Sequence, residues 1–293
     1  HIITTRVEHD AVRKVCESLE KEGLARVSRL DVDGGGQLDL QQLTDTIEDD
    51  TALVSVMMAN NETGVIFPIK EIAEIVHSRS VALLHVDGVN AAGKIAIDVR
   101  HLGVDLFSVS AHKFHGPKGI GALYIRGGVE LSSFHVGGGQ ENGRRAGTEA
   151  VHQIAGAGVA ADLASDLSGI DAIRSRRDKL ENAILDSIPQ TSVNGTRDPV
   201  GRLPNTSNIS FEGLNGEMIL HMLDEAGICV STGSACHAGS QGVSPVLAAM
   251  NVPFAAAMGS IRFSFGRFNN DSDVDAVMGV LPDIIGRLRA MAG

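Results

Sequence analysis

Short apolar runs that alternate with helical patterns constrain the fold of this chain more than any other sequence feature. Residues 53–58, 81–86 and 106–109 are such runs, and Pro68 opens a helical pattern between the first two. A strand that is apolar along its whole length is typically buried on both faces, as in parallel sheets covered by helices. The alternation therefore predicts an α/β fold with a mostly parallel central sheet.

The second half of the chain follows a different pattern. A long helical stretch at 151–188, rich first in Ala and then in charged residues, precedes several shorter elements. We expect three strands and two helices there, at 205–211, 228–231, 260–265, 217–226 and 274–291. The 293 residues, 43% of them hydrophobic, are enough to build two cores. We therefore predict a large domain over 1–165 and a smaller α+β domain over 166–293.

Polar side chains directly follow three of the predicted strands. Asn61 comes after the first strand and Asp87 after the second. The third strand is followed by Ser110, His112 and Lys113. In open α/β sheets, ligands bind in the crevice outside the carboxyl ends of the strands. We therefore expect these side chains to converge on one ligand site.

Asp87 and Lys113 are the pair of groups that pyridoxal 5'-phosphate (PLP) requires. A lysine holds this cofactor covalently, and an acid keeps its ring nitrogen protonated. Spacing alone favours an ordinary turn Asp and a surface Lys. The context reverses that balance, because Ser110 and His112 can donate hydrogen bonds to a phosphate and a glycine-rich turn follows at 116–121. We therefore predict that the chain binds PLP through Lys113.

Cys236 lies in the stretch best suited to a reactive thiol. Gly, Ser and other small residues dominate 231–242, which indicates a loop and not a core segment. A cysteine nucleophile must be reachable as its thiolate. Cys229 lies in an apolar run and Cys16 in a helical pattern, so we expect both to be buried structural thiols. Three cysteines form no disulfide framework and indicate a reducing compartment.

Two of these segments resemble those of a known family. Residues 110–122 read Ser-Ala-His-Lys-x-x-Gly-Pro-Lys-Gly-x-Gly-Ala and resemble the PLP-lysine segment of NifS/IscS-type cysteine desulfurases. Residues 231–236 resemble the active-cysteine loop of the same family. These enzymes are class-V aminotransferases of PLP fold type I. The resemblance implies a large PLP-binding domain, with a mostly parallel central sheet flanked by helices, and a smaller C-terminal α+β domain.

Further motifs, at 5–9, 60–64, 137–148 and 260–267, extend the resemblance over the whole chain. The resemblance implies that His9 stacks on the PLP ring and that Asn61 contacts both the cofactor's phenolic region and the substrate. Asn90 stands where the family usually has Gln beside that region. Thr148 lies on a loop that in the family reaches the neighbouring subunit and helps to bind the phosphate there. Arg262 is implied to bind the substrate carboxylate, a task suited to its paired donors.

The implied reaction converts L-cysteine to L-alanine. Lys113 moves the α-proton, and His9 serves as an acid or base. The Cys236 thiolate attacks the substrate sulfur and becomes a persulfide. A sulfur-acceptor or scaffold protein would collect this sulfur for iron–sulfur clusters, thiolated tRNA or cofactors. The resemblance also implies a homodimer in the cytoplasm, or in an organellar matrix in a eukaryote.

Other functions stay open on the sequence. Selenocysteine lyase shares the fold and the cofactor, and His237 is similar to a feature of those enzymes. Another aminotransferase is less favoured, because it has no use for a glycine-flanked Cys236. The chain begins at His1 in a predicted strand, without the family's N-terminal portion and its phosphate loop. A truncated, non-catalytic paralogue that only dimerises or binds a partner is therefore a further alternative, as is a cleaved or separate N-terminal part.

Charge and hydropathy argue against several partner classes. A net charge of −11 at pH 7 disfavours nucleic-acid binding, which needs a basic face. No apolar run approaches the ~20 residues of a membrane helix. Residues 31–36 are similar to the start of a calcium loop, but Gln42 stands where a bidentate Glu is needed. We therefore expect no nucleic acid, no membrane insertion and no metal.

Overall fold

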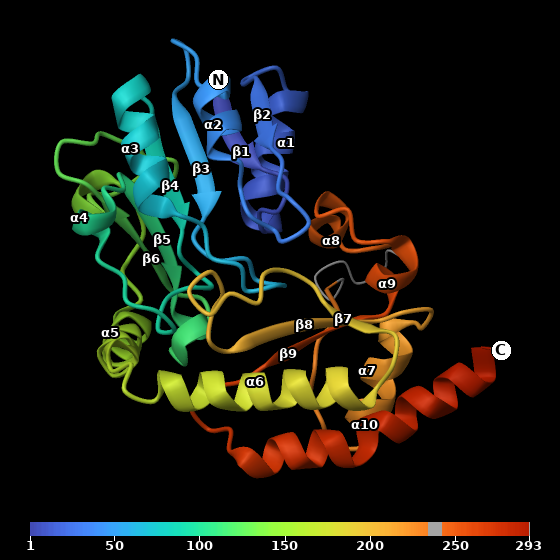
Figure 1. The fold of residues 1–293 in the computed structure, drawn as a ribbon. Helices are drawn as coiled ribbons and strands as arrows, with labels where there is room; N and C mark the ends of the chain where they lie inside the picture. The colour runs from blue at the N-terminus through green and yellow to red at the C-terminus, as the bar shows by residue number, and fades with distance from the viewer. Residues whose placement is uncertain (234–241, 293) are drawn as a thin grey trace.

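A six-stranded sheet organises the first half of the molecule (Figure 1). A computed structural model describes residues 1–233 and 242–292. The strand order is β2-β1-β3-β4-β5-β6, parallel throughout except for the antiparallel edge strand β6. The strands are β1 (Ile2–Thr5), β2 (Val27–Leu30), β3 (Leu53–Met57), β4 (Leu83–Asp87), β5 (Leu106–Ser110) and β6 (Gly121–Ile125). The predicted α/β fold with a mostly parallel sheet is therefore confirmed.

Helices pack on both faces of this sheet. The helices of this half are α1 (Asp10–Lys21), α2 (Leu40–Thr46), α3 (Ile69–Arg79) and α4 (Val99–Leu102). Of these, α2, α3 and α4 contribute residues to the first core, and α1 lies on the other face, where Glu20 pairs with Arg29 of β2. Val54 and Val56 of β3, Leu84 and Val86 of β4 and Ile72 of α3 are fully buried in this core. At about 25 cal/mol per Å², burial of such side chains is the main force that holds the sheet to its helices.

The opposite face of β4 departs from the expectation of burial on both faces. Leu83, His85 and Asp87 are only half-buried there. The His85 ring joins the Ser55 hydroxyl at Nδ1 and the Ser108 hydroxyl at Nε2, each at 2.8 Å. Burial lowers the pKa of His85, which favours the neutral ring. The apolar run of β4 thus includes a hydrogen-bonded polar group, for which the neighbouring strands supply the partners.

The second half forms a three-stranded antiparallel sheet with its own core. Its elements are β7 (Thr191–Val193), β8 (Thr206–Phe211), α7 (Gly216–Glu225), β9 (Ser260–Ser264) and α10 (Asp271–Ala292). In Figure 1, α10 runs beside α6 (Ile170–Ser187) below this sheet. The predicted strands at 205–211 and 260–265 correspond to β8 and β9. Among the described residues, no helix has the length and apolar character to cross a membrane.

The helix expected over 151–188 is interrupted. It divides into α5 (Val151–Ser165) and α6, and a turn separates the two. In that turn the Asp166 carboxylate accepts the N–H of Ser168 at 3.0 Å. Such side-chain bonds compete with helical hydrogen bonds and so favour a break in the helix. The helical pattern continues on both sides of the turn, so it did not reveal this break. The division of the chain into domains at residue 165 stays a prediction.

Segment 228–231 corrects two expectations. It is not a strand, because it pairs with β9 only through a bridge between Ser231 and Arg262. Its side chains alternate, so the apolar neighbours of Cys229 face the second core while Cys229 itself is exposed. The prediction of a buried Cys229 is therefore wrong. Cys16 of α1 is buried, as expected.

After residue 242 the chain returns to the first core. α8 (Pro245–Ala249) places Val246 and Leu247 there, and Met250 follows them. α9 (Phe254–Met258) then leads to β9. The late part of the chain thus packs against loops of the large sheet, close to the carboxyl ends of its strands.

Candidate active site

Asp87 is the last residue of β4, at the carboxyl edge of the large sheet. Its Oδ1 accepts the N–H of Val89 at 2.9 Å, which fixes the turn after the strand. Gly88 is required in this turn, because a Cβ there would lie 1.9 Å from Cζ of Phe107. The neighbouring strands therefore hold a half-buried carboxyl group at the sheet edge.

Lys113 lies on the short 3-10 helix η1 (Ala111–Phe114), directly after β5. Ala111 and Phe114 are buried, whereas His112 and Lys113 are exposed. The Ser110 hydroxyl contacts Nδ1 of His112 at 2.9 Å. The buried Ala111 and Phe114 thus anchor the turn. Lys113 lines a cavity of about 230 Å³, together with Lys94, Asp166 and Arg267.

Lys94 belongs to this site although the sequence analysis did not select it. Its Nζ donates to the backbone carbonyl of Asn90 at 2.6 Å and to Asn90 Oδ1 at 3.2 Å. Burial lowers the pKa of Lys94 to about 8, and the positive charges of Lys113 and Arg262 add to this effect. Lys94, Lys113 and Arg262 therefore lie close enough to repel one another. The residues around Lys94 in the sequence are mostly small or apolar, and nothing in them indicated that Lys94 lies close to Lys113 and Arg262.

The loop after β3 joins the two halves of the site. Asn90 Nδ2 donates to the Asn60 carbonyl at 3.0 Å. Arg262 of β9 donates from Nη1 to the carbonyl of Asn61 at 2.8 Å. Oδ1 of Asn61 is buried and has no hydrogen-bond partner among the residues that the structure describes. A buried acceptor without a partner costs free energy unless a ligand supplies the donor.

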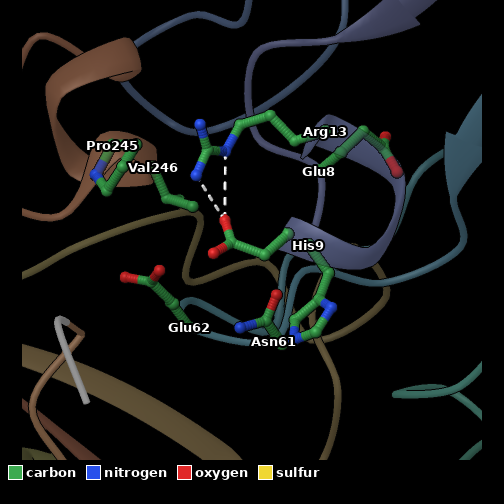
Figure 2. Close-up of a pocket in the computed structure, with 8 residues that line it drawn as sticks. Glu8, His9, Arg13, Asn61, Glu62, Pro245 and Val246 are labelled. Carbon is green, nitrogen blue, oxygen red and sulfur yellow. Dashed lines mark hydrogen bonds and ion pairs between the residues drawn. The ribbon is translucent and has the colours of Figure 1, made fainter. Parts of the chain in front are cut away.

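His9 lies on the other side of this loop, at the N-cap of α1. Its Nδ1 accepts the N–H of Ala11 at 3.2 Å. Figure 2 shows His9, Asn61 and Glu62 gathered around a small cavity of about 20 Å³, with Val246 of α8 near Glu62. Asn61 therefore lies between two residues that the family resemblance selected: it lines a cavity with His9, and its carbonyl accepts a hydrogen bond from Arg262.

Glu8 is a buried carboxyl that the sequence analysis did not assign to the site. Its Oε1 accepts the Thr5 hydroxyl at 2.7 Å and the N–H of Met57 at 2.9 Å. Burial raises its pKa to about 8, and the negative charge of Asp87 acts in the same direction. Glu8 therefore keeps its proton at neutral pH.

Two predicted site residues are not joined to the cluster. Cys236 lies outside the described residues. Thr148 is exposed on the loop between the 3-10 helix η2 (Gln140–Gly143) and α5, and it lines neither cavity. Lys113 and His9 line different cavities. The functional roles of all these residues stay predictions.

The donor set at the strand ends fits PLP. A lysine lines a cavity, a carboxyl group ends the preceding strand, and Ser110 and His112 offer donors beside the lysine. The buried, unpartnered Oδ1 of Asn61 indicates a polar group that a ligand would complete. Lys94 and Arg262 add positive charge suited to an anionic cofactor or substrate.

Comparisons with known proteins agree with this geometry. The class-V aminotransferase family model matches residues 1–277. A curated cysteine desulfurase of Trichormus azollae is 49% identical over 296 residues, which cover 100% of this chain and 72% of that protein. A cysteine desulfurase of Klebsiella pneumoniae is 48% identical over 292 residues, covering 99% of this chain and 72% of its own length.

Solved structures show the same architecture. A NifS-like protein superposes with a TM-score of 0.90 at 36% identity and covers 98% of this chain and 75% of that chain. The NifS-like protein of Rickettsia africae gives a TM-score of 0.85 at 31% identity, with 97% and 75% covered. SspA, solved in complex with cysteine, gives 0.76 at 31% identity, with 92% and 74% covered.

Proposed function

The chain belongs to the class-V aminotransferase family and to its PLP-dependent cysteine desulfurases, and on this premise we propose that Cys236 takes the sulfur of L-cysteine and passes it to an acceptor protein. The observation that carries the proposal is that Arg262 bonds the loop after β3 at Asn61, while Lys94 lies close enough to both Lys113 and Arg262 for their charges to lower its pKa. The curated relatives compared are cysteine desulfurases, so selenocysteine lyase and a non-catalytic paralogue are not favoured.

The cofactor residues divide by the part of PLP that they suit. Lys113 would hold the cofactor covalently, and Asp87 would pair with its ring nitrogen. Ser110 and His112 would donate to the phosphate, with Thr148 from a second subunit. Two asparagines and a histidine would contact the ring: Asn61, Asn90 and His9. When bound, PLP supplies an electron sink for the bonds around the substrate α-carbon.

The substrate is held through its carboxylate. The Arg262 guanidinium, fixed by its bond to the Asn61 carbonyl, would bind that carboxylate with paired hydrogen bonds. The Lys113 amine would then move a proton between the α-carbon and its neighbouring atoms, with His9 as a second acid or base. Lys94 contributes positive charge nearby, which favours an anionic substrate.

Sulfur transfer uses the thiolate of Cys236. Its sulfur attacks the substrate sulfur, so an S–S bond forms while the substrate C–S bond breaks. The electrons of the broken bond stay on carbon, which gains a proton and leaves as alanine. The persulfide on Cys236 carries the sulfur onward, so no outside oxidant or reductant is needed. A sulfur-acceptor or scaffold protein, for example in iron–sulfur cluster assembly, would then attack the outer sulfur.

A paired experiment tests these assignments. The protein is mixed with PLP, and its visible absorption is compared with that of Lys113→Ala. We expect a cofactor band in the parent that the variant lacks. Cys236→Ser should keep the band and abolish sulfide release from L-cysteine. A Cys236→Ser protein that still releases sulfide would contradict the role of Cys236, and an unchanged band in Lys113→Ala would contradict the role of Lys113.

We further propose that the protein acts as a homodimer in a reducing compartment such as the cytoplasm. Large apolar side chains are exposed on α5 and on the loop before η2: Phe134, Val136, Val151, Val159 and Leu163. Surfaces of this kind usually mark interaction sites. The nucleophile proposed at Cys236 must be a free thiol, and thiols stay reduced in such a compartment.

A further inference from the structure

One buried carboxyl group contacts the chain on both sides of the segment that carries Cys236. Glu62 lies on the loop after β3 and is 6% exposed. Its Oε2 accepts the hydroxyl of Ser244 at 2.5 Å. A Cβ built on Gly233 would lie 2.4 Å from the same oxygen and 3.2 Å from Cβ of Ser244. Gly233 and Ser244, which flank residues 234–243 in the sequence, therefore meet at one carboxylate oxygen.

Each of these contacts is rigidly supported. Asn60 Oδ1 accepts the N–H groups of Glu62 and Thr63, both at 2.9 Å, which fixes the backbone that carries the carboxyl. The Ser244 hydroxyl also accepts the N–H of Val246 at 3.1 Å and so caps α8. A side chain at position 233 would require the Glu62 carboxylate to shift, so glycine there leaves room for it. The three residues thus form one preorganised anchor.

The same loop contacts the substrate side of the site. Residue Asn61, next to Glu62, accepts the hydrogen bond from Arg262. Asn208 of β8 donates to the Glu62 carbonyl at 3.3 Å, which ties the loop to the small sheet. Figure 2 shows Glu62 beside Asn61, with Val246 of α8 nearby. A displacement of Glu62 would therefore change how Ser244 lies relative to the loop that Arg262 contacts.

We propose that Glu62 is a positioning residue for Cys236: together with Ser244 and Gly233, it fixes the two ends of the segment that carries the thiol next to the loop that holds Arg262. This inference rests on the proposed role of Cys236. It adds a residue outside the predicted site set. In this role Glu62 acts through Ser244 and Gly233.

The anchor should also respond to pH. Burial raises the pKa of Glu62 to about 7, while the positive charge of Arg262 lowers it and that of Asp10 raises it. Other ionisable groups facing the same cavity are Glu8, His9 and Arg13 of the α1 start. Above this pKa the carboxylate accepts a charge-assisted bond from Ser244, and below it the neutral acid accepts a weaker one. The ends of the segment should therefore be held more firmly on the alkaline side.

Alkylation of cysteine by iodoacetamide tests the proposal directly. Exposed Cys229 serves as an internal reference, and the rate at Cys236 is expressed relative to it by peptide mass spectrometry. In Glu62→Ala this ratio should rise by roughly tenfold, the factor that loss of one charge-assisted hydrogen bond corresponds to. Sulfide turnover should fall, while the absorption band with added PLP stays unchanged. An unchanged or lower ratio in a folded Glu62→Ala protein overturns the proposal.

Matched variants separate positioning from general destabilisation. Ser244→Ala removes the bond to Glu62 and a helix cap, whereas Asn215→Ala removes only the cap of α7. Ser244→Ala should raise the Cys236 ratio and Asn215→Ala should not; equal effects would overturn the proposal. Glu62→Gln, which keeps an acceptor oxygen, should restore part of the wild-type ratio and lose its change across pH 7. If the Cys236→Ser protein still releases sulfide from L-cysteine, the proposed function is wrong. If Cys236→Ser abolishes sulfide release but the Glu62 and Ser244 variants behave like the wild type, only this inference is wrong.

Discussion

Glu8 shows how one residue links burial, charge and stability. It lies between the His9 N-cap and Asp87, and its pKa rises from 4.5 to about 8 mainly because burial disfavours the carboxylate. Below pH 4.5 both the folded and the unfolded chain hold this proton. Between 4.5 and about 8 only the folded chain holds it, so the free energy of unfolding should decrease as pH rises through this window.

The variant Glu8→Gln tests this sign. Glutamine keeps the acceptor for Thr5 and Met57 but does not titrate. We expect the variant to gain stability over the wild type as pH rises, by up to a few kcal/mol, since one pKa unit corresponds to about 1.4 kcal/mol. Urea denaturation on both sides of the window measures this. A difference between the two proteins that is independent of pH would refute the shift. Glu62, whose pKa is also raised, makes the free energy of unfolding of both proteins decrease slightly further as pH rises.

The cysteines give a second prediction at the residue scale. Cys229 is exposed, whereas Cys16 is 5% exposed and burial raises its pKa. We expect a thiol reagent to label Cys229 in the native protein and Cys16 only after denaturation. Labelling of both at one rate under native conditions would contradict the alternation of segment 228–231.

At the scale of elements, an ion cluster fixes α6 against the small sheet. Glu181 of α6 binds Arg202 through two bonds of 2.7 and 3.2 Å and accepts the Ser207 hydroxyl at 2.7 Å. Arg202 and Glu181 are both almost fully buried. Arg197 provides a partly exposed third partner. Helix periodicity does not reveal such a cluster, because its members come from three separate segments.

Removal of one partner should therefore be costly. Glu181→Ala leaves the buried Arg202 guanidinium without its carboxylate, and such losses typically cost about 3–5 kcal/mol. Arg174→Ala, which breaks an exposed pair with Asp171 on the same helix, should change stability by less than about 1 kcal/mol. Chemical denaturation of both variants measures the difference, and similar midpoints would show that the Glu181 cluster contributes little.

At the scale of the whole molecule, exposed apolar side chains require an explanation. Phe134 is 91% exposed on the loop before η2, and α5 shows an apolar surface to solvent. We expect the wild type to sediment as a dimer and Phe134→Asp to shift it toward the monomer. Val200→Asp, at an equally exposed apolar residue on another loop, should not. A monomeric wild type, or equal effects of both changes, would reject the proposed dimer.

The sequence alone determined the local elements and the chemical classes. Continuous apolar runs indicated the parallel strands, because burial leaves a direct compositional mark. Asp87 and Lys113 were selected because few residue types serve a pyridinium or a covalent cofactor bond, whereas Arg262 was selected through the family resemblance. The strands needed only short-range pattern, and the architecture of the large sheet confirmed them.

Only the tertiary structure decided which distant residues meet. The contacts of Arg262 with Asn61, of Glu62 with Ser244 and of Glu181 with Arg202 join segments far apart in the sequence. Burial of Glu8 and exposure of Cys229 likewise depend on neighbours that pack from elsewhere. Periodicity reports which face of an element is apolar. The desolvation of a side chain, and therefore its pKa, depends on which other elements pack against that face. The same packing decides which long-range contacts form.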